Sequence, residues 1–444
     1  MKPPRKPTRP PLPRAPLEFA HPLSVERGEV SGAILLAEAP REYALPLWRT
    51  YRLVLSTARR GRAALALDAP GLARWEAYVL EQVDAWDADV WGALAVIATA
   101  MRNPAEADRE WIAFACMALA DWCVERGAGA AAVCLAEAAA IAVPGSARYA
   151  YVAGRMHRER GNYRDAEHWL DRSRRVAVWN SDREAHAIAL NSLGNLNQQV
   201  GRYAVAEAFL RSALLTARRA RLRERIPFIY HDLLVVAVYT GNLARAGEYA
   251  REALHAYPPG HPNVPKLAHD IAWLWFQHGY FRRALQVFDA LLLSFTEPGA
   301  RLHVLGYAAR AAGATADEAR FGQYWSEAWE IIRQDRSERL HSAAALELGL
   351  GALELSRWND AEAALAMAVE SAAASGENET VVTASAALER VGRREGASRA
   401  GSPAGGKALH AEDAFAGELA AELVAHGGVS GVPLSTAAHD ASRA

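Results

Sequence analysis

Two stretches of the chain follow one pattern: AGRMHRERGNYRDAEHWL at residues 153–170 and LGNLNQQVGRYAVAEAFL at residues 193–210. In each, a glycine at the second position is followed seven residues later by another glycine. An aromatic residue stands two positions beyond that second glycine, and an alanine stands five beyond it. A glycine that ends one helix at little conformational cost, just before a large residue that opens the next, is typical of a helical hairpin. The alanine suits the closest point between two helices, because leucine there overpacks the contact by roughly 1–3 kcal/mol.

The same pattern recurs along the chain at nearly regular intervals. The turn glycines are Gly127, Gly161, Gly201, Gly241, Gly279 and Gly313. The alanines five residues after the first five of them are Ala132, Ala166, Ala206, Ala246 and Ala284. Repetition at this period predicts a solenoid, in which each hairpin buries its apolar face against its neighbours.

Three units depart from the pattern. Gly129 stands where the first unit should have a large residue, so we expect its second helix to start later or to pack loosely. Glu318 occupies the alanine position of the sixth unit, which is therefore out of register with Gly313. Ser356 replaces the turn glycine of the seventh unit.

The pattern resembles the tetratricopeptide repeat family, most clearly in Ala153–Leu170 and Leu193–Leu210. The resemblance extends over residues 111–391 and implies an all-α, right-handed superhelical solenoid of antiparallel helical hairpins. Several intervals between turn glycines are longer than the family's usual repeat of about 34 residues, as in its bacterial regulatory members. The resemblance also implies that the first helices line a concave groove, in which asparagine and basic residues hold a peptide. Asn191, Asn195 and Arg155 match those positions.

Four regions are expected. Residues 1–16 are rich in proline and basic residues and predict a disordered tail. Residues 17–110 show helical periodicity and several tryptophans without the repeat, which predicts an N-terminal helical cap on the array at 111–391. Within the cap, Ser24–Arg41 is a weak candidate for a helix-turn-helix. Residues 392–444 predict a flexible tail with one helix at 411–426, which docks on a partner, folds back on the solenoid or stays marginal.

Composition excludes several classes of protein. The formal net charge is −1, so nucleic acid is not expected as a direct partner. The sequence contains no stretch of about 18 apolar residues, so membrane insertion is not expected. The N-terminus also lacks the apolar run of a signal peptide. We therefore expect a cytoplasmic protein. The cysteines at 116, 123 and 134 stand in an apolar helical setting, which favours buried small side chains over a metal or redox site.

Catalytic constellations are missing from the sequence. It contains no phosphate-binding glycine loop, no His-Glu-x-x-His, no Cys-x-x-Cys and no Gly-x-Ser-x-Gly motif. We therefore predict that the chain is not an enzyme and needs no cofactor or metal.

Candidate binding residues follow from the repeat register. Residues three, six, ten and thirteen positions before each turn glycine lie on one side of the first helix, opposite the hairpin core. Those selected are Arg148, Tyr151, Arg155, Arg158, Asn191, Asn195, Gln198, His231, Lys266, His269, Trp273, His303, Tyr307 and Arg310. Arginine pairs with carboxylates, and amides pair with peptide backbone. The set predicts an exposed groove for another protein or a peptide with acidic character. In the alternative interpretation, several of these side chains pack against the cap or neighbouring repeats, and Trp273 belongs to the core.

Three functions are compatible with such an array. The first is a protein-interaction module that binds an extended peptide in its groove. The second is a peptide- or ligand-responsive regulator, and the third is an assembly scaffold that self-associates through its ends or through the 411–426 helix. The sequence favours the first.

Overall fold

The computed structural model describes residues 33–60, 69–82, 87–334, 341–395 and 407–426 of the 444-residue chain. The predicted 1–16 tail and the first half of the Ser24–Arg41 candidate lie outside these residues. The described part is all-α, and it divides into two compact units, Met1–Leu222 and Arg223–Ala444. None of its helices combines the length and the apolar character needed to cross a membrane.

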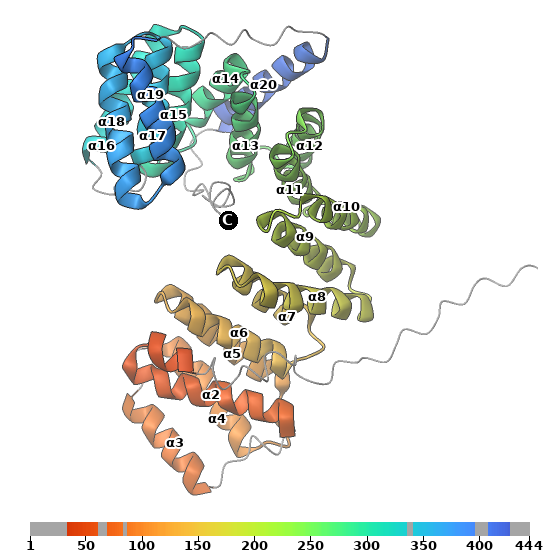
Figure 1. Cartoon of the computed structure of the whole chain (residues 1–444). Coiled ribbons are helices and arrows are strands. Elements are labelled where there is room, and N and C mark those ends of the chain that lie inside the picture. Colours follow the sequence, from red (N-terminus) through yellow and green to blue (C-terminus); the bar gives the residue numbers. More distant parts are fainter. Residues whose placement is uncertain (1–32, 61–68, 83–86, 335–340, 396–406, 427–444) are drawn as a thin grey trace, which may run out of the picture. The chain divides into compact units, whose positions relative to one another are not determined.

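Unit 1 comprises an N-terminal cap followed by three hairpins (Figure 1). The cap helices are α2 (Arg41–Arg60), α3 (Ala69–Gln82) and α4 (Ala88–Arg102). The hairpins are α5 (Arg109–Glu125) with α6 (Gly129–Ala142), α7 (Ala147–Glu159) with α8 (Tyr163–Trp179), and α9 (Arg183–Gln199) with α10 (Tyr203–Ala220).

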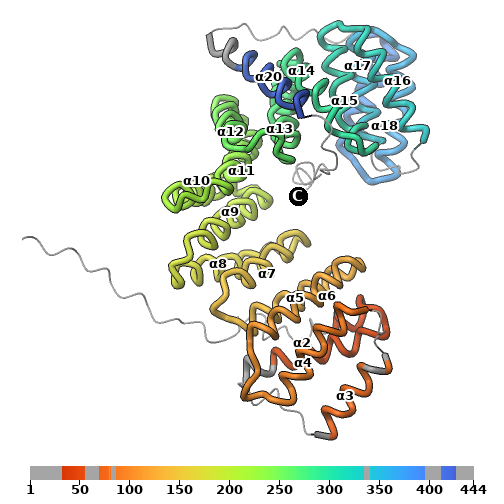
Figure 2. The backbone as a smooth tube through the Cα atoms, turned by 180° about the vertical axis from the view of Figure 1, so that it is seen from behind, coloured from red at the N-terminus to blue at the C-terminus, as the bar shows by residue number. Residues whose placement is uncertain are grey.

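Unit 2 continues the hairpin order and ends in two single helices (Figure 2). Its hairpins are α11 (Ile226–Tyr239) with α12 (Leu243–Ala256), α13 (Val264–Gln277) with α14 (Phe281–Leu291), α15 (Pro298–Ala314) with α16 (Glu318–Gln334), and α17 (His341–Glu354) with α18 (Trp358–Ser375). The single helices are α19 (Asn378–Gly392) and α20 (Lys407–His426).

The turn glycines behave as the sequence predicts in the first five hairpins. Gly127, Gly161, Gly201, Gly241 and Gly279 have φ between 66° and 77°, the left-handed region that favours glycine. The alanines five residues beyond them are fully buried. The predicted hairpin register is therefore confirmed for these units.

The earlier glycines permit close helix packing, as expected. A Cβ atom added at Gly154 would lie 2.8 Å from Cγ of Leu170, and one at Gly194 would lie 2.6 Å from Cγ of Leu210. Each leucine stands nine residues after its turn glycine. In each of these hairpins, a leucine of the second helix thus packs directly on the first helix at its glycine.

Two of the units that depart from the repeat pattern form their turns without a glycine. Gly313 lies inside α15, and Ala316 takes the left-handed turn position with φ 58°. Gly313 instead allows α15 to contact α17, because its Cβ position falls 2.9 Å from Cα of Gly351. Ser356, with φ 56°, occupies the turn of the next hairpin as predicted.

The second helix of the first repeat also differs from its prediction. The helix α6 neither starts late nor packs loosely: it begins at Gly129, and nearly all of its residues are buried. The reason is that α6 lies beneath the cap helix α2 as well as beside α5 and α7. Glu38 accepts hydrogen bonds from the backbone N–H groups of Ala130 and Ala131 at 2.8 and 3.0 Å, which ties the cap to the start of α6.

The cap tryptophans divide between core and surface. Trp75 is buried and Trp48 is half-buried in a core that runs continuously into the first two hairpins. Trp91 is exposed. The predicted region boundaries at 110 and 391 do not coincide with the division between the two compact units, and they stay predictions.

Candidate functional site

Each first helix of unit 1 is started by a side-chain cap. Asp108, Ser146 and Asp182 accept hydrogen bonds from backbone N–H groups in the first turns of α5, α7 and α9. Each of these helices also ends at a left-handed glycine, which marks the same point of every hairpin. Residues at equal distances before the turn glycine therefore occupy equivalent positions on the three helices.

The predicted residues of unit 1 occupy one side of α7 and α9, which we call the first-helix face. All seven are accessible: Arg148 is exposed, and the other six are half-buried. The six are Tyr151, Arg155, Arg158, Asn191, Asn195 and Gln198. The two helices contact each other directly, so these side chains form one continuous surface.

On α5, the first helix of the preceding hairpin, the sequence interpretation missed exposed apolar side chains. Thirteen and three positions before Gly127 stand Phe114 and Val124, with 59% and 53% of their surface exposed. Trp111, one turn before Phe114, is also 59% exposed, and the two rings meet edge to face with centroids 5.9 Å apart. Counting back from Gly127, as was done from the other turn glycines, would have found Phe114 and Val124.

Arg155 of this face makes only an exposed ion pair. Arg155 pairs through Nη1 with Oε1 of Glu159 at 3.1 Å, one helical turn away, and the two side chains are 43% and 48% exposed. An exposed pair of this kind contributes little to stability. Arg155 is therefore available to exchange Glu159 for a carboxylate of a ligand.

Unit 2 presents a different surface. The predicted residues His231, His269 and Tyr307 are only 4–8% exposed, so the expectation that they face solvent is wrong. His231 Nε2 lies 2.9 Å from Oδ2 of Asp270, and His269 Nδ1 lies 3.4 Å from Oδ1 of the same carboxylate. Burial alone would raise the pKa of Asp270, but the hydrogen bonds from the two histidines hold it well below its ordinary value.

The other residues of unit 2 continue this packed layer. The ring of His303 stands 5.5 Å from that of His269 and 4.8 Å from that of Tyr307. Burial is the main cause of the raised pKa of the Tyr307 hydroxyl. Lys266 and Trp273 are half-buried beside this layer.

Arg310 already has a carboxylate partner in the chain. Its Nη1 lies 2.8 Å from Oε2 of Glu347, and its guanidinium stands 5.2 Å from the ring centre of Phe276. The prediction of an open arginine is thus wrong here. The partners Asp270 and Glu347 were missed because they lie outside the counted positions, on α13 and α17.

The displaced turn explains the burial of Tyr307. Counted from Ala316 instead of Gly313, the outward positions thirteen and six residues before the turn are His303 and Arg310, which are half-buried. Tyr307 then falls on the side that faces the hairpin core. The binding role of the predicted residues stays a prediction, and the accessible ones are concentrated in unit 1.

Residues 146–219, which cover α7 to α10 except for the last residue of α10, match the tetratricopeptide repeat family. These 74 of the 444 residues form tetratricopeptide repeats. No curated protein sequence matches it significantly.

Several solved structures are similar to this chain. A signal transduction ATPase from Pyrococcus horikoshii with a tetratricopeptide repeat sensor is 13% identical, with a TM-score of 0.50 over 78% of this chain and 56% of that one. PilF of Pseudomonas aeruginosa is 19% identical (TM-score 0.39, 51% of this chain and 99% of that chain). The Rap conjugation gene regulator of plasmid pLS20, in complex with the Phr* peptide, is 13% identical (TM-score 0.37, 84% and 99%). At such identities the likeness concerns the fold alone.

Proposed function

We propose that this tetratricopeptide repeat protein binds an extended segment of a partner protein on the first-helix face of unit 1. The observation that carries the proposal is the order of side chains in equivalent repeat positions. Exposed aromatic residues on α5 are followed by arginines on α7 and by amides on α9. A surface that only needed to be solvated would not place Trp111 and Phe114 side by side in the open.

Each part of the face suits one feature of an extended peptide. The rings of Trp111 and Phe114 offer a large contact area at low entropic cost to an apolar side chain. Arg148 and Arg155 offer charge-assisted hydrogen bonds to a carboxylate. The amides of α9 have both donors and acceptors for a peptide backbone. The favoured ligand is therefore an acidic segment with an aromatic or aliphatic anchor.

Unit 2 is not assigned to this role. His231, His269 and Arg310 already pair with Asp270 and Glu347 of the chain itself, so a ligand would have to replace these part-buried hydrogen bonds. The proposal of a binding module, and not an enzyme, rests on the side chains of unit 1.

Selection from a displayed library of random linear peptides, with the full-length chain as target, tests the proposal. We expect enrichment of acidic peptides that carry one aromatic or aliphatic residue. Their affinity should fall at least about tenfold, or roughly 1.4 kcal/mol, in Phe114→Ser and in Arg155→Ala.

Matched controls lie on α8, the second helix of the middle hairpin. Val178→Ser and Arg164→Ala alter exposed residues of similar character away from the first-helix face, and they should leave the affinity unchanged. Peptides that respond to the α8 variants and not to the α5 and α7 variants would place the binding surface elsewhere.

A further inference from the structure

The last helix of the chain does not continue the repeat array. The helix α20 packs mainly on α14, with additional contacts to α12 and α13. In the sequence, the hairpins α15–α16 and α17–α18 and the helix α19 lie between α14 and α20. Figures 1 and 2 both show it alongside α13 and α14. The helix is thus an added element, seated on a surface that the preceding repeats build without it.

The contact has an apolar centre. Phe415, Leu419 and Leu423, spaced four residues apart, are at most 3% exposed. The ring of Phe415 meets that of Trp275 edge to face, with centroids 6.1 Å apart. The helix runs four residues further toward its N-terminus than the predicted 411–426 helix, and it folds back on the array, which is one of the outcomes left open by the sequence.

The rim of the contact is complementary in charge. Glu412 pairs with Arg251 at 2.6 Å, Asp413 pairs with Arg283, and Glu418 lies 3.0 Å from His255. Every acidic side chain of α20 meets a donor on the array, because Glu422 accepts from the backbone N–H of Gly260 at 2.9 Å. The surface selects for an acidic amphipathic helix.

Glycines on the array bring the helix close. A Cβ atom at Gly247 of α12 would lie 2.6 Å from Oε1 of Glu412, and one at Gly260 would lie 2.8 Å from Cδ2 of His426. We call this surface the α20 seam. Its residues are Gly247, Arg251, His255, Gly260, Trp275 and Arg283.

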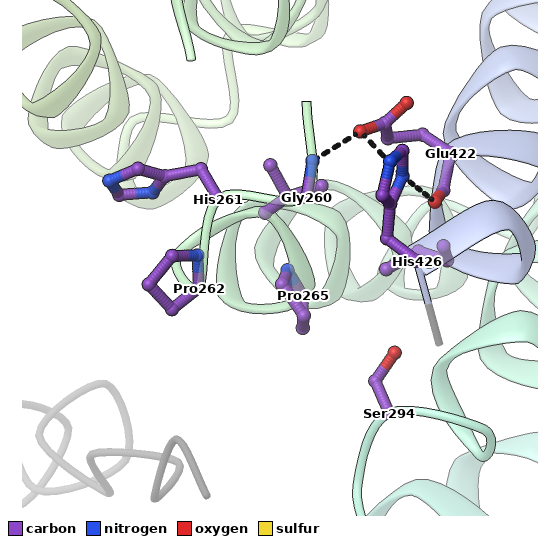
Figure 3. A pocket seen from close by; sticks show the side chains of 9 residues that line it. Gly260, His261, Pro262, Pro265, Ser294, Glu422 and His426 are labelled. Carbon is purple, nitrogen blue, oxygen red and sulfur yellow. Dashed lines mark hydrogen bonds and ion pairs between the residues drawn. The ribbon is translucent and has the colours of Figure 1, made fainter. Parts of the chain in front are cut away.

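The C-terminal end of α20 is less completely packed. A pocket opens there between the last turn of α20, the α12–α13 connection and Ser294 (Figure 3). His426 turns back to Glu422 of its own helix, with Nδ1 3.1 Å from Oε1.

We infer that the α20 seam is a docking site for an acidic amphipathic helix of a partner protein, and that α20 is a tethered occupant which such a helix displaces. Fourteen residues, 393–406, lie between α19 and α20, and the last eleven of them are rich in glycine, serine and alanine. A short tether holds a ligand at a millimolar effective concentration, so the site stays closed until a competing helix binds. This surface is separate from the first-helix face of unit 1, and its role does not depend on that proposal.

Hydrogen exchange of the unaltered full-length protein tests the first half of the inference. Amides of α20 are expected to exchange through an opening that leaves α13 and α14 protected. Exchange of α20 only together with α13 and α14 would show that the helix is a permanent part of the core and would overturn the inference.

Binding of a labelled synthetic peptide of residues 407–426 tests the second half. In full-length Phe415→Ala/Leu419→Ala, the tethered helix competes poorly, and the probe should bind at least about tenfold more tightly than to wild type. Val424→Ala, an exposed position of the same helix, should bind the probe as wild type does.

Charge reversal of the seam completes the test. Adding Arg251→Glu and Arg283→Glu to the double variant should abolish probe binding. Equal probe affinity for wild type and the double variant, or binding that survives the charge reversal, would overturn the inference.

Discussion

The contact between α15 and α17 offers a sharp test of the packing argument, because two glycines bring these helices together. A Cβ atom at Gly313 would lie 2.9 Å from both C and Cα of Gly351 and would also press on its carbonyl oxygen. Conversely, a Cβ atom at Gly351 would lie 2.9 Å from the carbonyl oxygen of Ala309. The obstacle is backbone on both sides, so no side-chain rotation relieves it.

The expected magnitude for Gly313→Ala combines two opposing effects. Alanine in a helix interior is favoured over glycine by about 1 kcal/mol. Overpacking costs about 1–3 kcal/mol and occasionally more. Because the two helices must separate, the cost should lie at the upper end, and the net loss of stability is about 2 kcal/mol.

Gly322→Ala in α16 is the matched control, since no atom lies within 4 Å of its Cβ position. This variant keeps only the helix-propensity gain and should be more stable than wild type by about 1 kcal/mol. The two alanine variants should therefore differ by roughly 3 kcal/mol.

Urea denaturation followed by circular dichroism measures this difference, and hydrogen exchange in α15 and α17 locates it within unit 2. If Gly313→Ala is as stable as Gly322→Ala, the interpretation of Gly313 as a packing glycine is incorrect. Protection lost elsewhere, with α15 and α17 unaffected, would refute it as well.

Further predictions concern four other positions. Ala316→Gly should stabilise unit 2 by about 0.5–1 kcal/mol in urea denaturation, because glycine adopts the left-handed turn conformation without strain. Asp270→Asn should destabilise it by about 1–3 kcal/mol at neutral pH. Since the folded-state pKa of Asp270 is lowered, its contribution is present above the unfolded pKa of about 3.9 and is lost as the pH falls below that value, so denaturation of wild type and variant should converge in acid. Phe114→Ser should change the free energy of unfolding by less than about 0.5 kcal/mol, because the ring is exposed. Cys116 should stay unreactive toward a thiol reagent at pH 8 until denaturant is added, since burial raises its pKa to about 12.

Much of the hairpin architecture could be predicted because it depends on short-range spacing. A glycine, a large residue two positions on and an alanine five positions on involve only neighbouring turns of one hairpin. The pairs Gly154–Leu170 and Gly194–Leu210 obey the same local spacing in the structure. Positions such as Arg155 and Asn195 could therefore be placed on an accessible face by counting alone.

Counting back from a glycine gave the wrong outward positions where that glycine packs two helices together and does not form the turn. Gly313 and Ala316 both stand near the end of α15, and the sequence does not show which of them forms the turn. The position of the turn depends on α17, because Gly351 packs so closely on α15 that the facing residue must lack a side chain. A contact between hairpins thus decides the register within one of them.

The sequence by itself determined that this protein is an array of helical hairpins and that its turns recur at nearly regular intervals. Where a glycine forms the turn, it also determined which side of the first helix points away from the hairpin core. Only the tertiary structure decided which of those sides stay open. His231 finds its carboxylate on a helix 39 residues away, and His255 of the α20 seam meets Glu418 of α20 across 163 residues. Helical periodicity specifies the direction of a side chain relative to its own helix, whereas its partner depends on how distant helices pack, and no local spacing records that.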